Sequence, residues 1–286
     1  MNTDLEGLCV VITGASGGIG WAAAEAFAAE GASLLLHAHT GGEGLRARVD
    51  RAPWSDRAAI FAGDLREPSI AEAMIDAALE RFGRVDVTVV SAGVWPSEPL
   101  PLWSLPAPRI REVIDTNLVA AIFSARAALS ALARTGPRAD GRGASLCFIG
   151  STAGRFGEAG HLEYAVTKSA LHGLVRTLKN EIVDLDPYGR VNLVEPGWTV
   201  TPMARPALAE PGILPRVLAT MPLRQLARPE DIARSIVFLS SPALARHVTG
   251  EILTIAGGME GRRRWEAGDI DEDAVLRRLA ADDAPG

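Results

Sequence analysis

VVITGASGGIGWAAAEAF, residues Val10–Phe27, is the stretch that decides the fold of this chain. A β-prone apolar run ends at Thr13, and an alanine-rich run typical of a helix follows the glycines. Gly14 permits a tight turn, Gly18 lets a backbone approach a pyrophosphate, and Gly20 lets the helix pack on the strand. Free N–H groups at the start of such a helix face phosphates. Because the loop directly follows the first expected strand, it predicts a dinucleotide site rather than a plain glycine-rich connection.

Strand-like and helix-like segments alternate along most of the chain. The expected strands are 8–13, 33–38, 58–64, 85–93, 145–150, 190–196 and 251–257, and the expected helices are 21–31, 69–83, 110–135, 163–185 and 229–241. The strands are nearly continuously apolar, as in a parallel sheet with helices on both faces. The alternation predicts an α/β fold, a Rossmann-like doubly wound parallel sheet of about seven strands. We expect residues 1–258 to form a single domain.

Three segments fall outside this alternation. Residues 136–143 form a polar, turn-rich loop. Residues 198–228 are interrupted by prolines directly after the sixth expected strand, which predicts a mobile cover over a substrate site. Residues 259–286 form a charged C-terminal tail, in which DIDEDAVLRRLAADD (269–283) places acids before arginines and suits a short helix. A solvated or packing arm is as good an interpretation of this tail as a functional one.

Charge and composition argue against several classes of protein. The formal net charge of -6 disfavours a surface that holds nucleic acid. Cys9 and Cys147 lie in apolar runs, which indicates buried cysteines in a reducing compartment. No apolar run reaches the length of a bilayer span, and the N-terminus resembles neither a signal nor a transit peptide. We therefore expect a cytoplasmic protein that acts on neither nucleic acid nor membrane.

The segment HLEYAVTKSA (His161–Ala170) carries a second signal. Nearly all positive charge in the chain is arginine, yet Lys168 follows Tyr164 by one helical repeat, so both side chains share a helix face. A tyrosine hydroxyl, with an ordinary pKa near ~10, is a poor base at neutral pH. A nearby ammonium lowers that pKa, and carbonyl reduction needs a proton donor at the oxygen. Taken alone, the pair is more typical of an ordinary helix surface than of a catalytic site.

Together, the glycine spacing TGxxxGxG and the YxxxK pair make residues 5–258 resemble the short-chain dehydrogenase/reductase family. The other matching elements are Asp64-Leu65 after the third strand, Ser91-Ala92-Gly93 where the family has NNAG, Asn117, Ser151, and Pro196-Gly197 within EPGWTVTPM (195–203). These elements occur in the family's order and at the expected strand ends. The resemblance implies an NAD(P)-dependent oxidoreductase that transfers hydride between nicotinamide and a ketone or secondary alcohol.

The resemblance also implies a role for each matching residue. Tyr164 would be the acid or base, Lys168 would bond the nicotinamide ribose, and Ser151 would bond the substrate oxygen. Asn117 would hold a water that links Lys168 to solvent. The implied cofactor-binding residues are Gly14, Ser16, Gly17, Gly18, Ile19, Gly20, Ala38, His39, Asp64, Leu65, Ser91, Ala92, Gly93, Tyr164, Lys168, Pro196, Gly197, Thr199 and Thr201.

The choice between NADP and NAD depends on the end of the second strand. In the family, an acidic residue there selects NAD, whereas this chain has Ala38, so a 2′-phosphate is not repelled. His39 would help to neutralise that phosphate, although Gly17 stands where NADP-using relatives often carry a basic residue. We expect NADP, with NAD as the alternative. His37 and His39 could be read as a metal pair, but no carboxylate or cysteine evidently joins them, so we expect no metal.

The substrate is less defined by the sequence. The candidate rim residues are Trp95, Trp103, Arg155, Phe156, His161, Trp198 and Met203. Aromatic walls favour an apolar or ring-bearing substrate, although Trp95 and Trp103 could equally anchor a proline-rich loop. His161 is interpreted as incidental. A 3-oxoacyl thioester and a ring or sugar-type alcohol are both open.

An alternative function is a non-catalytic dinucleotide-binding sensor or scaffold. A binder without turnover has no need of the set Ser151, Tyr164 and Lys168, which argues against it. The family resemblance further implies a homodimer or homotetramer. Small residues on the two long expected helices, such as Ala121 and Ala125, permit close helix packing.

Overall fold

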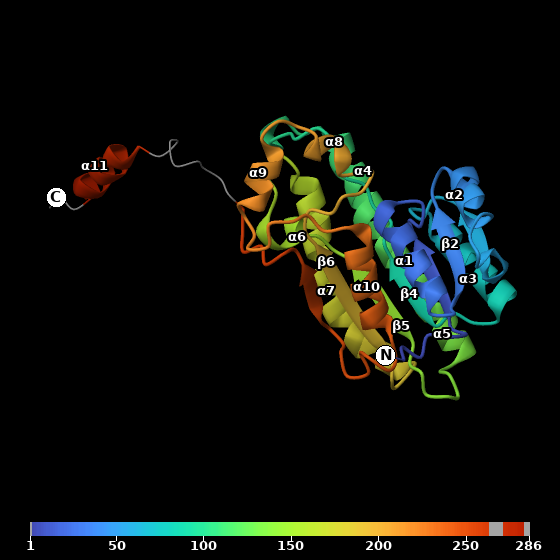
Figure 1. Cartoon of the computed structure of the whole chain (residues 1–286). Helices are drawn as coiled ribbons and strands as arrows, with labels where there is room; N and C mark the ends of the chain where they lie inside the picture. Colours follow the sequence, from blue (N-terminus) through green and yellow to red (C-terminus); the bar gives the residue numbers. More distant parts are fainter. Residues whose placement is uncertain (1, 263–270, 283–286) are drawn as a thin grey trace.

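The computed structural model describes residues 2–262 and 271–282 and contains one parallel sheet (Figure 1). Its strands are β1 (Cys9–Thr13), β2 (Ser33–Ala38), β3 (Ala58–Ala62), β4 (Val87–Val90), β5 (Ser145–Ile149), β6 (Arg190–Pro196) and β7 (Ile252–Ile255). They lie in the order β3-β2-β1-β4-β5-β6-β7, all paired in parallel. The chain order reverses between β1 and β4, and such a reversal opens a crevice at the carboxyl ends of the strands. The predicted doubly wound fold is confirmed.

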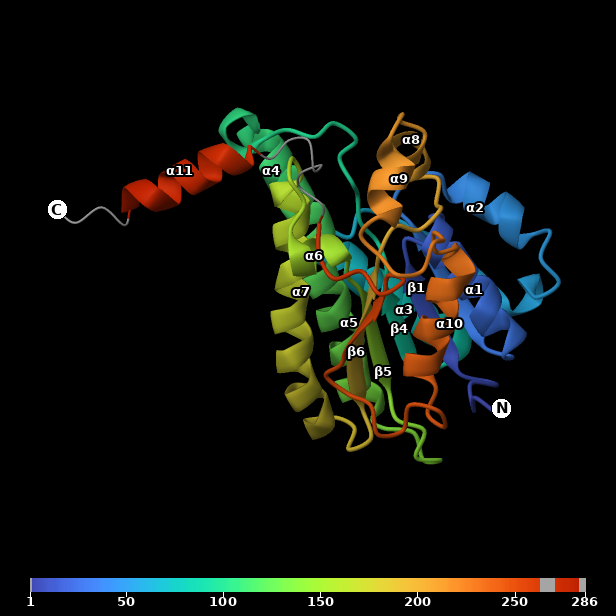
Figure 2. The ribbon, with the colours of Figure 1, turned by 60° about the vertical axis from the view of Figure 1, so that its left-hand side comes forward.

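Helices cover both faces of the sheet. They are α1 (Gly18–Ala29), α2 (Gly42–Val49), α3 (Pro68–Phe82), α4 (Ala107–Ile114), α5 (Ala120–Thr135), α6 (Thr152–Phe156), α7 (Leu162–Glu181), α8 (Arg205–Leu208), α9 (Ile213–Leu218), α10 (Pro229–Ser240) and α11 (Glu272–Asp282). Figure 2 shows α1 and α10 side by side on one face, and α5 and α7 on the other. Short 3₁₀ turns occur at Ser55–Arg57, Leu102–Ser104 and Ile182–Asp184.

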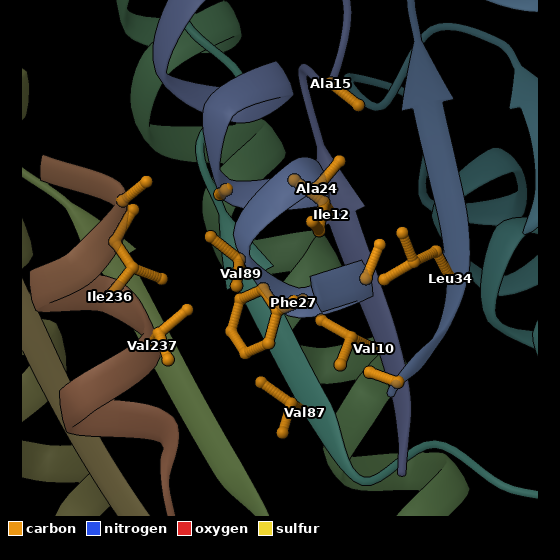
Figure 3. Close-up of a cluster of buried hydrophobic side chains, with 14 of the residues drawn as sticks. Val10, Ile12, Ala15, Ala24, Phe27, Leu34, Val87, Val89, Ile236 and Val237 are labelled. Carbon is orange, nitrogen blue, oxygen red and sulfur yellow. The ribbon is translucent and has the colours of Figure 1, made fainter. Parts of the chain in front are cut away.

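The apolar strands pack on both faces because successive side chains point to opposite sides of a sheet. Val10 and Ile12 of β1 join Phe27 of α1 in the cluster drawn in Figure 3. Val11, between them, packs with Met74 of α3 on the other face. This two-sided burial is the reason that the strands read as continuous apolar runs rather than as alternating ones.

Some expected boundaries differ from the structure. The expected helix 21–31 begins three residues earlier, at Gly18, so the last two loop glycines belong to its first turn. The expected helix 110–135 begins at Ala107 and contains a π turn at Asp115–Val119. Helix α2 was not expected, because two of its eight residues are glycines, which disfavour a helix.

The continuous helical segment Ala107–Thr135 is long and apolar enough, by length and composition, to cross a membrane. This corrects the expectation that no segment reaches that length. Half of its most apolar stretch, 50%, is buried inside the domain. Ala127 and Ala128 pack in the cluster around α3, and Ala121 and Ala125 pack in the cluster around α7. The buried half of this stretch is therefore partnered within the fold.

The segment 198–228 lies over the carboxyl end of the sheet and contains α8 and α9 (Figure 2). Val217 and Met221 pack there against Ala256 and Met259, which follow β7, so the cover has a small apolar cluster of its own. In the tail, the expected helix is confirmed over Glu272–Asp282, and α11 stands apart from the sheet in both views (Figures 1 and 2). Residues 263–270 and 283–286 of the tail lie outside the described residues.

Candidate active site

A cavity of about 500 Å³ opens at the carboxyl ends of the strands, beneath the 198–228 cover. Of the residues expected to bind cofactor or catalyse, its wall contains Gly14, Ser16, Gly17, Gly18, Ile19, Gly20, His39, Asp64, Leu65, Ser91, Ala92, Gly93, Ser151, Tyr164, Lys168, Pro196, Gly197, Thr199 and Thr201. Two expected residues, Ala38 and Asn117, are not part of this wall. The structure thus brings together residues from six of the seven strand ends.

The glycine loop has the shape of a phosphate cradle. Gly14 has a φ of +66°, and a Cβ atom built on it would lie 2.8 Å from the Cα of Ala92. A Cβ on Gly18 would lie 2.9 Å from the Thr201 side chain. The N–H groups of Gly18, Ile19 and Gly20 find no acceptor in the described part of the chain, and no side chain caps α1. Unpaired donors at a helix N-terminus fit the pyrophosphate of a dinucleotide.

Two buried side chains hold this loop in place. The Thr13 hydroxyl accepts hydrogen bonds from the N–H groups of Ser91, at 2.9 Å, and Ala92, at 3.0 Å. His37 Nδ1 accepts the Gly14 N–H at 3.3 Å, and its Nε2 lies 2.9 Å from the Gly63 carbonyl. Both contacts require the neutral tautomer that carries its proton on Nε2. Burial lowers the pKa of His37, in agreement with that form.

Both ring nitrogens of His37 are therefore committed to backbone contacts. No group of three or more His, Cys, Asp or Glu side chains with metal-binding geometry occurs within residues 2–262 and 271–282. The expected cofactor-binding residue Ala38 is not at the cavity wall. It is fully buried in the core beside α1, because alternation along β2 turns its side chain away from the cavity and leaves His39 at the wall.

Two arginines, Arg66 at the wall and Arg48 on α2, lie near His39 and the glycine loop. Arg66 makes a two-pronged ion pair with Asp64, with its Nη2 2.6 Å from Oδ2, and this contact holds the pKa of Asp64 at about 2. His39 Nε2 lies 3.7 Å from the same carboxylate. Arg48 of α2 packs its guanidinium 3.9 Å from the Trp21 ring centroid and places Nη1 3.5 Å from the Ser16 carbonyl. The only carboxylate of this group is thus already paired.

Tyr164 and Lys168 lie one turn apart on α7 and both face the cavity. Lys168 Nζ donates to the Ile149 carbonyl at 2.9 Å and lies 5.7 Å from the Tyr164 ring centroid. Burial lowers the pKa of Lys168 to about 8. Burial also raises the pKa of Tyr164 to about 12, helped by the Glu158 charge and opposed by the Ser151 hydroxyl. The expectation of a lowered Tyr164 pKa is wrong for the protein's own groups, because desolvation is the largest cause of the shift.

Ser151 and Asn117 are held by backbone contacts. Ser151 Oγ accepts the Ala153 N–H at 3.1 Å and so caps α6, which orients its hydroxyl at the cavity wall. Asn117 lies in the π turn, where its side-chain amide accepts the Val94 N–H at 2.7 Å and donates to the Val94 carbonyl at 3.0 Å. Asn117 therefore holds the segment after β4. Its expected role in binding a water stays a prediction.

The candidate rim residues divide into two groups. Trp95, Trp198 and Met203 line the cavity. Trp103, 89% exposed, does not, and Arg155 instead donates to Thr254. His161 is not part of the cavity wall either, but it is buried and stacks on Trp95 with ring centroids 3.9 Å apart. Trp95 in turn meets Tyr164 edge-on at 4.7 Å, so His161 fixes the aromatic wall beside the tyrosine.

Sequence reasoning missed three charged residues of the wall, Arg66, Glu158 and Arg262. Glu158 lies in the loop between α6 and α7, and Arg262 follows β7 in the charged tail. Their side chains pair at 2.9 Å although they are 104 residues apart in the chain. No local pattern marks either residue, because only the folded chain brings them together.

Comparison with known proteins gives several full-length matches. The sequence model of a family described as enoyl-(acyl carrier protein) reductase matches residues 14–260. An L-rhamnose 1-dehydrogenase (NAD(P)(+)) of Sphingomonas sp. is 34% identical over 257 residues, which is 89% of this chain and 97% of that protein. The 3-oxoacyl-[acyl-carrier-protein] reductase of Escherichia coli is 30% identical over 256 residues, 90% and 98% of the two chains.

Solved structures are similar over the same range. A crystal structure described as a short-chain dehydrogenase/reductase, glucose/ribitol dehydrogenase, from Brucella melitensis has a TM-score of 0.80 and 34% identity. The alignment covers 90% of this chain and 98% of that one. A putative gluconate dehydrogenase from Agrobacterium tumefaciens has a TM-score of 0.81 and 27% identity, with 91% and 98% covered.

Proposed function

The chain belongs to the short-chain dehydrogenase/reductase family, and from this premise we propose that it acts on a ring or sugar-type alcohol, with NADP and with Tyr164 as acid/base. It is an oxidoreductase that transfers hydride between nicotinamide and a ketone or secondary alcohol. A non-catalytic sensor is set aside, since these relatives are named as dehydrogenases and reductases. Residues 1–258 are proposed as the catalytic domain.

One observation carries the assignment of the site: Ser151, Tyr164 and Lys168 line the same cavity as the glycine loop. A nicotinamide cofactor bound there supplies or accepts the hydride. Tyr164 Oη takes the proton of the substrate hydroxyl in oxidation and returns it in reduction. Ser151 Oγ hydrogen-bonds the substrate oxygen, and the ammonium of Lys168 favours the phenolate. Since the pKa of Tyr164 is about 12, alcohol oxidation should accelerate as the pH rises above neutrality.

The test of this assignment uses both tyrosines of the chain. Tyr164→Phe should lower kcat by at least about 100-fold, since it removes the proton-transfer group, and should leave the NADPH dissociation constant unchanged. Tyr188→Phe is the matched control, because Tyr188 is exposed and is not part of the cavity wall. Turnover retained in Tyr164→Phe would overturn the assignment of the acid/base group.

Two features support a ring or sugar-type substrate. Trp95 and Trp198 line the cavity with Tyr164, and flat aromatic walls suit the faces of a ring. Two of the relatives are named for sugars or polyols, an L-rhamnose 1-dehydrogenase and a glucose/ribitol dehydrogenase. A 3-oxoacyl thioester is the second candidate, because 3-oxoacyl reductases are also similar along nearly the whole chain. Initial rates over a panel of aldoses, polyols and 3-oxoacyl thioesters, with both cofactors, distinguish the two.

The preference for NADP is supported by the charges at the adenosine end of the cavity. His39 and Arg66 line it, and the Asp64 carboxylate is already paired with Arg66. A 2′-phosphate therefore meets donors rather than a free carboxylate. Fluorescence titration should give tighter binding of NADPH than of NADH, and Arg66→Ala should reduce that preference. Tighter binding of NADH would defeat the proposal.

We also propose assembly into a homodimer or homotetramer and a cytoplasmic location. The outward side of α7 exposes Leu162 and Val166, and α5 exposes Ile122, so the two long helices carry apolar surface outside the domain core. Light scattering after size-exclusion chromatography measures the mass directly. A mass of 30.2 kDa, that of one chain, would reject the assembly. Cys9 and Cys147 are both free and buried, which fits a reducing compartment.

A further inference from the structure

The substrate end of the cavity is completed by a residue from the charged tail. Arg262 follows β7 and lies beyond residue 260, where the match to the family model ends. Its side chain nevertheless lines the same cavity as Tyr164 and Ser151. The tail therefore contributes a guanidinium to a site whose other walls come from the strand ends and the loops that follow them.

Arg262 is held by Met259, whose sulfur accepts from its Nη1 at 2.7 Å, and by one short segment of the chain around α6. Its Nε donates to Glu158 Oε2 at 2.9 Å, and its Nη2 donates to Thr152 Oγ1 at 3.3 Å. The guanidinium carbon lies 5.7 Å from the ring centroid of Phe156. Thr152, Phe156 and Glu158 lie on α6 or directly after it, between Ser151 and Tyr164. The contacts fix the guanidinium next to the reacting groups.

The pair is poorly solvated. The Arg262 and Glu158 side chains are 22% and 23% exposed. An ion pair withdrawn from water contributes little stability by itself, because the attraction is offset by the loss of hydration. The presence of such a pair in a ligand cavity is better explained by binding, because its N–H groups and carboxylate oxygens can hydrogen-bond a polar ligand. A saturated acyl chain has no hydrogen-bond donor or acceptor, so it would displace water from the Arg262–Glu158 pair without replacing the lost hydrogen bonds.

We propose that Glu158 and Arg262 determine specificity by binding hydroxyl groups on carbons near the one oxidised. The guanidinium donates to a substrate oxygen, and the carboxylate accepts from a substrate hydroxyl. Because the pair has no net charge, it selects a neutral polyhydroxylated substrate, such as an aldose, over a sugar acid. This inference rests on the proposed ring or sugar-type substrate and adds the residues that recognise it.

The same pair acts on the proton-transfer group. The Glu158 charge raises the pKa of Tyr164, and Arg262 partly neutralises that charge. Removing Arg262 should therefore raise the pKa of Tyr164 further, and removing the charge of Glu158 should lower it. These opposite shifts in the pKa of Tyr164 would not arise if the Glu158–Arg262 contact were purely structural.

The experiment measures kcat and KM of the full chain for one accepted aldose and for its deoxy analogues, each of which lacks one hydroxyl. The variants are Arg262→Ala, Arg262→Lys and Glu158→Gln. Arg234→Ala is the control, since it removes a surface arginine from its pair with Asp231. Arg262→Ala should lower kcat/KM for the aldose by about 10- to 100-fold, as expected for one hydrogen bond with a charged partner. Arg262→Lys should recover part of the loss.

The deoxy analogues identify the hydroxyl that is bound. The analogue without that hydroxyl should show nearly the same kcat/KM in wild type and in Arg262→Ala or Glu158→Gln. The pH profile of kcat should move to higher pH in Arg262→Ala and to lower pH in Glu158→Gln. Circular dichroism and thermal unfolding of each variant identify those that fail to fold, and Glu158→Gln then carries the test alone.

The outcomes separate this inference from the proposed function. If wild type reduces a 3-oxoacyl thioester and oxidises no aldose or polyol, the proposed function fails. If wild type oxidises aldoses but the variants lose activity equally on the parent and on every deoxy analogue, the inference about Glu158 and Arg262 is overturned. The same holds if both variants leave the pH profile unmoved.

Discussion

Thr13 provides the sharpest test of how the glycine loop is held. Its hydroxyl accepts two backbone N–H groups, those of Ser91 and Ala92, at 2.9 and 3.0 Å. Thr13→Val replaces the hydroxyl with a methyl group of similar volume and leaves both donors without an acceptor. Thr13→Ser is the matched control, because it keeps the hydroxyl and loses only a methyl group.

The expected magnitude follows from these contacts. An unsatisfied buried donor costs about 1–3 kcal/mol, and Ser91 and Ala92 are half-buried, so Thr13→Val should lose about 2–4 kcal/mol. Thr13→Ser should lose about 1 kcal/mol, from one methyl group. With roughly 2–4 °C per kcal/mol for a domain of this size, Thr13→Val should lower the Tm by about 4–16 °C.

Thermal unfolding monitored by circular dichroism measures the Tm, and fluorescence titration measures the NADPH affinity. That affinity should also fall in Thr13→Val, because Gly14 and Ala92 on either side of the bond line the cavity. If Thr13→Val is no less stable than Thr13→Ser, the hydroxyl does not hold β1 to the end of β4, and the reasoning is refuted.

The other predictions concern buried ionisable groups. Lys168→Met should abolish turnover yet stabilise the fold at pH 7 by about 2 kcal/mol. Burial of the ammonium lowers its pKa from 10.5 to about 8, which destabilises the wild-type fold by roughly 1.4 kcal/mol per unit. The variant also loses the hydrogen bond to the Ile149 carbonyl, which offsets about 1 kcal/mol of that gain. The unfolded chain binds more protons between those two pH values, so wild type gains stability as the pH rises from 8 to 10.5. The Tm difference between the two proteins should therefore shrink there, and a constant difference would contradict the explanation. His172→Phe should destabilise the fold by about 3–5 kcal/mol, because it removes the 2.9 Å partner of the fully buried Glu195 carboxylate. Urea unfolding measures this loss. The double variant His172→Phe with Glu195→Leu should recover much of the lost stability, because it also removes the buried charge.

Much of the candidate site was accessible from local sequence. The glycine loop and the Tyr164–Lys168 pair can both be recognised from residues that are close together in the chain. Burial was harder to anticipate. Ala38 stands at the expected position at the end of β2, yet its side chain points into the core, since the alternation along β2 turns its neighbours His37 and His39 to the cavity instead. The helix α2 and the π turn around Asn117 also followed from packing rather than from propensity.

By itself, the sequence determined the doubly wound sheet, the position of the dinucleotide site and the family, because apolar periodicity and short spacings are local properties of the chain. Only the tertiary structure decided which groups meet and how they ionise. It brought Glu158 and Arg262 together from 104 residues apart and stacked His161 on Trp95. It also set the pKa of Tyr164 at about 12, above its ordinary value rather than below it, because desolvation depends on the surroundings that the whole fold creates.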